Sequence, residues 1–294
     1  MLTLPAQILG ILSSLAAAAS WGGGDFAGGI ATRRNHAFLV LAITGSTGMV
    51  LLTLLAFITG ETELTWRDGT WAVTAGIFGG VGLISLFRGL ALGSAAVVSS
   101  ISGVVGVMVP VIAGAFLEGL PNPWQFAGFL LGIAGIWLVT RSGTVPEEAV
   151  SHTHPESGSA FSRPLVLAFT AGISFGLFFV LIAQVSPEAV FAPLAISKAT
   201  QAAGGLALVI FLRIRMSDRG GIPPALLSGL LDVGGNTFFL LASKLTRLDA
   251  AAVLVSMYPV GTVLLSRILL KERVSISQWL GVGLCVGAIA LIAI

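Results

Sequence analysis

The sequence predicts an all-α integral membrane protein whose ten transmembrane helices form two inverted five-helix repeats. Composition, regular apolar segments and internal similarity predict this class. Of the 294 residues, 55% are hydrophobic and only 10% are charged, and the mean hydropathy is +0.99. A soluble domain carries about 25% charged residues, so a surface this apolar must lie mainly in lipid. The formal net charge of +2 gives no reason to expect a nucleic-acid partner.

Ten segments are apolar enough and long enough, at about 20 residues each, to cross a bilayer. No Lys or Arg precedes Arg33, so the first segment lacks the basic start of a signal peptide and is expected to be retained. In order, the segments cover 7–31, 37–59, 70–92, 95–117, 123–140, 164–184, 189–212, 222–243, 249–270 and 277–294.

Clusters of charged and turn-forming residues separate these segments. Several of these separators are only a few residues long, so helices that follow one another in sequence are expected to lie antiparallel and adjacent. The separators are TRRNH at 32–36, ETELTWRDG at 61–69, LEGLPNP at 117–123, SPE at 186–188, RIRMSDRGG at 213–221 and LKERVS at 270–275.

The longest polar stretch, 141–163, is rich in Ser, Gly, Pro and acidic residues and cannot bury an apolar face. It is predicted to be a linker between a first repeat at 1–140 and a second at 164–294. The linker contains His152 and His154, but two histidines in a polar loop are a weak metal signal. The only cysteine, Cys285, lies in an apolar run. We therefore expect no metal site and no cofactor.

The two halves share short patterns about 154 residues apart. Glu118 ends the fourth segment and Glu272 ends the ninth, and each is followed by a Gln and a Gly that open the next segment. Ser20-Trp21-Gly22 in the first segment matches Ser174-Phe175-Gly176 in the sixth. Because each half has an odd number of helices, the second half must begin on the opposite side of the membrane. Inverted repeats of this kind are typical of alternating-access transporters.

Several of these motifs together resemble the drug/metabolite transporter superfamily, in its EamA-domain branch. They are WGGGDFAGG in the first segment, FRGLA at 87–91, the small residues that open the fourth segment, Glu118, Glu272 and Tyr258-Pro259-Val260. The resemblance covers nearly the whole chain. It implies ten helices, a central cavity between the halves, and transport of amino acids, metabolites or drugs.

Charged residues inside a bilayer are costly and are candidates for function. Asp25 and Arg88 lie in the last third of the first and third segments, which run in the same direction, so they are expected at similar depth. They could pair with each other, or either could bind the charged end of a substrate. Trp21 lies one turn before Asp25 on the same helix face, where it could contact a cationic or aromatic group.

The segment 222–243 has the clearest polar face, which includes Asp232 and Asn236. Asp232 is expected near the middle of the membrane. It is a possible coupling carboxylate that binds and releases a proton, or a counter-ion to a cation. Alternatively, it is a hydrogen-bonded Asp that holds helices together.

Four further residues could line the cavity. Tyr258 could donate a hydrogen bond into it, and Phe175 and Phe179 could form an aromatic wall, although interhelical packing is the more common role of such residues in membrane helices. Lys198, close to Gln201, is the weakest candidate because a lysine side chain can extend to the membrane interface.

These features favour a secondary active transporter that moves a small metabolite such as an amino acid, amine or drug-like solute. The sequence has no HExxH motif and no Cys–His pair that would indicate a catalytic site, so we predict that it is not an enzyme. The alternatives are a channel or a membrane-embedded enzyme acting on lipid. The expected partners are a small-molecule substrate, the lipid bilayer, and protons or an exchanged solute. We expect a monomer in a bacterial cytoplasmic (inner) membrane.

The orientation of the chain is open. Most basic residues of the predicted loops lie on the side away from the termini, so the positive-inside rule places both termini outside the cytoplasm. The family resemblance implies cytoplasmic termini. A reporter that is active on only one side of the membrane, fused to one terminus, distinguishes these two orientations.

Overall fold

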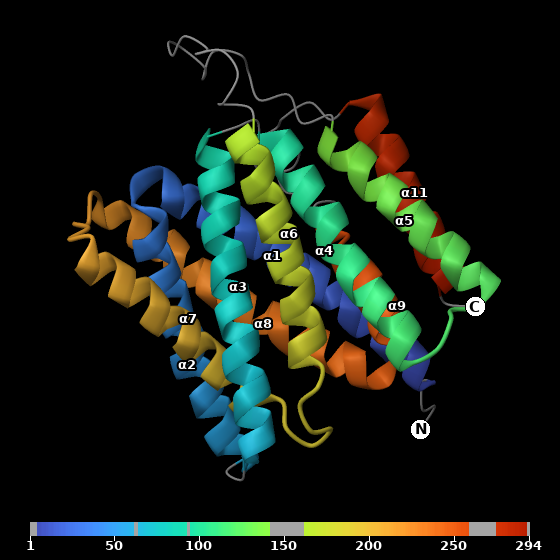
Figure 1. The fold of residues 1–294 in the computed structure, drawn as a ribbon, viewed down its shortest axis with the longest axis horizontal. Coiled ribbons are helices and arrows are strands. Elements are labelled where there is room, and N and C mark those ends of the chain that lie inside the picture. The colour runs from blue at the N-terminus through green and yellow to red at the C-terminus, as the bar shows by residue number, and fades with distance from the viewer. Residues whose placement is uncertain (1–4, 62–63, 93–94, 142–161, 259–274, 293–294) are drawn as a thin grey trace.

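The computed structural model describes residues 5–61, 64–92, 95–141, 162–258 and 275–292. Every regular element in these ranges is helical (Figure 1). The elements are α1 (Ala6–Arg34), α2 (Ala37–Thr59), α3 (Trp66–Leu92), α4 (Ala95–Leu117), α5 (Pro123–Arg141), α6 (Ser162–Ile182), α7 (Phe191–Phe211), the 3-10 turn η2 (Arg219–Gly221), α8 (Ile222–Leu245), α9 (Leu248–Val255) and α11 (Ile276–Ile292).

Several predicted features lie outside the described residues. They are most of the linker with its two histidines, the second part of the predicted helix 249–270 with Pro259, and Glu272.

The start of α3 differs from the prediction, which placed its first turn in a polar separator. Thr65 precedes the helix, and its hydroxyl accepts the backbone N–H of Asp68 at 3.1 Å and donates to the Asp68 carboxylate at 2.6 Å. This side-chain cap satisfies a backbone donor that the first turn would otherwise leave unpaired. The charged residues at 66–68 therefore belong to the helix.

The helices of the two repeats pack on each other in a pattern that stays the same when the repeats are exchanged. α1 packs on α8 and α6 packs on α3, so the first helix of each repeat contacts the third helix of the other. α2 packs on α7, and α5 packs on α11. In Figure 1, α1 runs upward from the N-terminus at the bottom of the view, whereas α6 starts near the top and runs downward.

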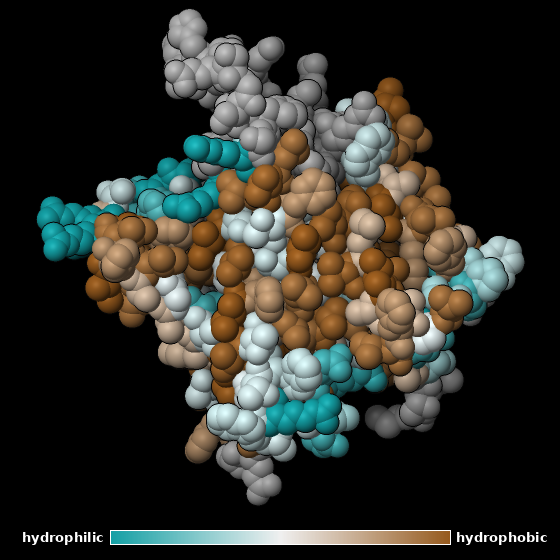
Figure 2. Space-filling model, viewed as in Figure 1, coloured by the Kyte–Doolittle hydropathy of each residue, from teal (hydrophilic) through white to brown (hydrophobic). Residues whose placement is uncertain are grey.

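The outer surface is apolar over much of its area. Figure 2 shows hydrophobic residues across the middle of the molecule, with hydrophilic residues gathered toward its ends. Large side chains such as Phe57, Phe116 and Phe211 are 77%, 86% and 83% exposed. Five described helices, α2, α3, α6, α7 and α8, are long and apolar enough to cross a membrane, and shorter apolar helices lie in α4, α5 and α11. A surface of this kind fits burial in lipid.

Hydrogen bonds join the repeats at both ends of α2. Before α2, the side-chain oxygen of Asn35 accepts the backbone N–H groups of Ser217 and Asp218 at 3.0 and 3.2 Å. Beyond α2, a carboxylate oxygen of Asp68 accepts the backbone N–H of Ser186 at 2.7 Å and its hydroxyl at 3.0 Å. A helix of 23 residues is roughly 34 Å long, so these two connections lie at opposite ends of the bundle.

Two glutamates of the first repeat cap helices of the second. The Glu61 carboxylate accepts the backbone N–H groups of residues 190–192 at the start of α7, at 2.7 to 3.0 Å. The Glu118 carboxylate accepts the N–H of Leu248 at the start of α9 at 3.0 Å. Partial burial, helped by the nearby Asp249, raises the pKa of Glu118 above its usual value. Both acids lie where a helix N-terminus favours negative charge.

Candidate functional site

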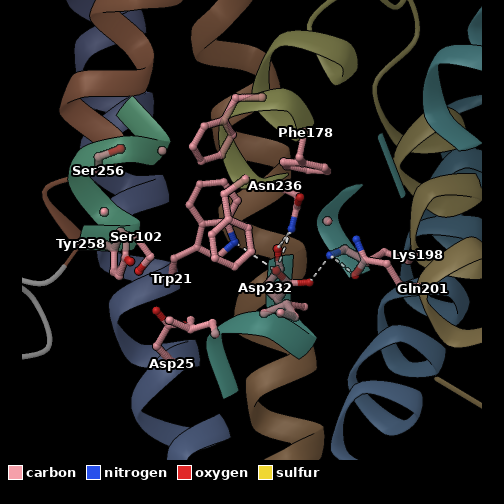
Figure 3. Close-up of a pocket in the computed structure, with 17 residues that line it drawn as sticks. Trp21, Asp25, Ser102, Phe178, Lys198, Gln201, Asp232, Asn236, Ser256 and Tyr258 are labelled. Carbon is pink, nitrogen blue, oxygen red and sulfur yellow. Dashed lines mark hydrogen bonds and ion pairs between the residues drawn. The ribbon is translucent and has the colours of Figure 1, made fainter. Parts of the chain in front are cut away.

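A pocket lies between the two repeats, near the centre of the bundle (Figure 3). The first repeat contributes residues from α1, α3 and α4, and the second contributes residues from α6, α7, α8 and the turn just after α9. The lining residues are Trp21, Asp25, Gly79, Leu83, Leu86, Ser102, Gly103, Gly106, Phe175, Phe178, Phe179, Lys198, Gln201, Asp232, Asn236, Ser256 and Tyr258.

Asp232 is at the centre of the polar contacts in this pocket. One carboxylate oxygen, Oδ2, lies 2.5 Å from Nζ of Lys198 on α7. The other, Oδ1, accepts Nε1–H of Trp21 on α1 at 3.0 Å and an amide N–H of Asn236 at 2.8 Å. Asn236 lies one turn further along α8, so its bond is the local i, i+4 contact of a helix. Asp232 therefore joins three helices from both repeats.

Lys198 does not extend to an interface as the sequence suggested. Its side chain is 3% exposed, and Nζ also donates to the side-chain oxygen of Gln201 at 3.1 Å. Burying an ammonium group is costly unless it is paired and hydrogen-bonded, and both conditions hold here. Lys198 was the weakest sequence candidate, and the structure places it within the site as the partner of Asp232.

Glycines on neighbouring helices provide the space for these side chains. A Cβ at Gly235 would lie 2.5 Å from the indole ring of Trp21, and a Cβ at Gly79 would lie 2.6 Å from the amide of Gln201. A Cβ at Gly48 would lie 3.0 Å from the aliphatic part of Lys198. The many glycines of this sequence thus do more than bring helix backbones close together, because some let long polar side chains reach the pocket.

The structure separates Asp25 from Arg88. Asp25 lines the pocket, whereas the Arg88 guanidinium is exposed and lies 5.2 Å above the ring of Phe38 at the start of α2. No ion pair joins the two in the part of the chain that the structure describes. Of the two alternatives for these residues, the mutual pair is not formed: α1 packs on α8 while α3 packs on α6, so similar depth does not bring the two side chains together.

The remaining sequence candidates all line the pocket. Phe175, Phe179 and Tyr258 are among its lining residues, as are Trp21 and Asn236. Trp21 and Phe179 have ring centroids 5.6 Å apart, and Phe178 lies 5.7 Å from Phe179 on the other side. Aromatic rings therefore form one wall of the pocket, and Leu83 and Leu86 add to its apolar lining.

The sequence reasoning missed Phe178, Ser102 and Ser256 as lining residues. Phe178 adjoins a residue that was selected, but helical periodicity gave no reason to choose both. Serines are common in membrane helices as packing residues, so no signal marked these two.

A family model for the EamA-like transporter family matches residues 8–141 and again residues 162–294. The chain belongs to the EamA-like transporter family. Each match covers one of the two repeats, so the internal similarity found in the sequence is that of two EamA units. Members of this family are membrane transporters of the drug/metabolite transporter superfamily. The EamA-like chain is accordingly an integral, multi-pass membrane protein.

The fold is also found in solved structures. One, titled only "Crystal structure of protein", superimposes with a TM-score of 0.75 over 96% of this chain and 95% of its own, at 19% sequence identity. Identity this low establishes the fold alone. Comparison with curated protein sequences gives no match.

Proposed function

We propose that this EamA-like protein is a secondary active transporter that moves a small metabolite by alternating access through the pocket between its repeats. One observation carries the proposal: Trp21 of the first repeat and Lys198 of the second both contact Asp232 within that pocket. A relative movement of the repeats must change the contact between Trp21 and Asp232, which joins one repeat to the other. A site whose geometry depends on both repeats is what a carrier requires.

The packing symmetry supports alternating access. If the ten predicted segments all span the bilayer, the repeats are inverted, and exchanging their conformations turns a pocket open on one side into one open on the other. Asn35 and Asp68 join the repeats near opposite ends of the bundle. Breaking one connection while keeping the other is a simple way to open one end at a time.

Asp232 remains our candidate for the coupling carboxylate. Protonation of Asp232 would remove the charge that holds Lys198, so a proton and the Lys198–Asp232 ion pair compete. Coupling to protons or to an exchanged solute needs no nucleotide motif. The two repeats of one chain enclose the pocket, which favours a monomer as the transporting unit. We propose a bacterial cytoplasmic membrane as its location.

The test is counterflow in proteoliposomes, with a solute chosen by its ability to raise the thermal unfolding temperature of the purified protein. The screen covers amino acids, amines and common metabolites. Saturable counterflow is the result expected of a carrier. Flux that rises linearly with concentration would instead identify a channel, and chemical conversion of an added lipid would identify an enzyme.

A further inference from the structure

We infer that the pocket binds the cationic group of an aromatic or apolar amine, and that Asp25, rather than Asp232, is the carboxylate that receives it. This inference rests on the proposed transport function and names its substrate class. Four observations carry it: the saturation of Asp232, the availability of Asp25, the charge of the pocket and the aromatic wall.

Asp232 has little capacity left for a ligand. Its Oδ1 accepts hydrogen bonds from Trp21 and Asn236, and its Oδ2 is paired with Lys198. A substrate ammonium group would have to displace one of these partners. Displacing Lys198 would leave a buried ammonium without its counter-ion, which is strongly unfavourable.

Asp25 differs in every one of these respects. It has no hydrogen bond or ion pair with any partner among the residues that the structure describes, yet it lines the same pocket. Its carboxylate is close enough to Asp232 and to Tyr258 to interact with each electrostatically. In Figure 3 it lies on the side of the pocket near Tyr258, away from Lys198 and Gln201.

The charges of the lining residues do not balance. Among them, Asp25 and Asp232 are acidic and Lys198 is the one basic residue, so with all three ionised the described pocket carries one excess negative charge. An uncompensated charge in a low-dielectric site is unfavourable and favours a bound cation. Arg88 does not supply the missing charge, since its guanidinium lies over Phe38 outside the pocket.

The wall beside Asp25 suits an organic cation. Trp21 lies one turn from Asp25 on α1, and the bond to Asp232 holds its indole in place. Phe179 packs against Trp21 at 5.6 Å, and Phe239, fully buried, packs on both rings from behind at 6.1 and 4.6 Å. Aromatic faces stabilise ammonium groups and also bury apolar surface. An inorganic cation would gain nothing from the second effect.

The experiment compares probes that share a ring and differ in charge. Thermal unfolding of the purified full chain is followed with phenethylamine, phenylalanine and 3-phenylpropionate, and with the indole series tryptamine, tryptophan and indole-3-propionate. We expect an amine to raise the unfolding temperature in a saturable way at millimolar concentration, and the carboxylates to have no effect. Stabilisation by an amino acid or a carboxylate in preference to both amines would overturn the inference, as would no effect of either amine.

The variant Asp25→Asn should weaken amine binding roughly tenfold or more, because it removes the charge but preserves the shape. Asp25→Glu should recover part of the affinity. The matched control is Glu188→Gln, which makes the same chemical change at an exposed position outside the pocket. Unchanged amine affinity in a folded Asp25→Asn variant contradicts the assignment, and if that variant does not fold, the wild-type charge series decides.

Transport is measured separately, with an N-trimethylated phenethylamine that cannot cross the bilayer unaided. If amines bind saturably but the trimethylated compound is not transported, the cation site stands and the carrier proposal fails. If an amino acid is carried and no amine binds, the carrier proposal stands and the cation site fails.

Discussion

The indole N–H of Trp21, on the first helix of the first repeat, donates to Asp232 on the third helix of the second repeat at 3.0 Å. This bond crosses the interface on which alternating access would depend. It also places an aromatic ring from one half of the protein beside an ion pair that lies wholly in the other half, Lys198 with Asp232.

The variant Trp21→Phe removes this donor and keeps an aromatic ring. We expect it to destabilise the protein by about 1.5–3 kcal/mol, the usual range for a hydrogen bond to a charged group, and to reduce transport. Trp124→Phe is the control, because Trp124 is 59% exposed on α5 and lies outside the pocket. Equal unfolding temperatures for the two variants in the same detergent would show that the bond contributes little.

Neutralising Lys198 alone leaves a carboxylate without its counter-ion. We expect Lys198→Met to cost about 3–5 kcal/mol of stability and to abolish transport. The double variant Lys198→Met with Asp232→Asn removes both charges and should recover much of the stability but not the transport. A double-mutant cycle by thermal unfolding measures this coupling, and strictly additive effects of the two substitutions would argue against a functional ion pair.

The close approach of Gly235 to Trp21 gives a test of how the site is positioned. In Gly235→Ala the new Cβ would lie 2.5 Å from the indole ring, so Trp21 must move away from Asp232. We expect lower stability and at least a severalfold loss of transport. Gly204→Ala on α7, where nothing lies within 4 Å of the added Cβ, should gain up to about 1 kcal/mol from helix propensity. Transport at the wild-type rate by Gly235→Ala would mean that this position of the indole is dispensable.

The hydrogen bonds at the two ends of α2 should have opposite effects on access to the pocket. We expect Asp68→Ala to favour opening at the end where Asp68 meets Ser186, and Asn35→Ala to favour opening at the other end, each shifting the balance about tenfold. The reporter is the substitution Ser256→Cys, in the pocket lining, in a background with Cys285→Ala, since Cys285 is the only cysteine of the chain.

The rate at which an impermeant maleimide labels the introduced thiol is measured from each side of the membrane. Thr74→Ala is the control on α3, because its hydroxyl bonds only within its own helix. Parallel changes from both sides in the two variants would indicate general loosening instead of alternating access.

The sequence by itself determined the membrane class, the two repeats and a short set of embedded polar residues. These follow from local properties: apolar length sets a spanning segment, and the cost of desolvation makes every embedded charge conspicuous. Asp25 and Asp232 were selected in this way, and Trp21 was selected because it lies one turn from Asp25; all three line the pocket.

Only the tertiary structure decided which of these residues meet. The similar depth of Asp25 and Arg88 made a pair between them one of two possibilities, whereas the ion pair in the pocket joins Asp232 to Lys198, which was the weakest candidate in the sequence. Depth along a helix can be read from sequence, but rotation about its axis and the choice of neighbouring helix cannot. Both are set here by packing between repeats, including the space that Gly48 leaves for Lys198 and Gly235 for Trp21.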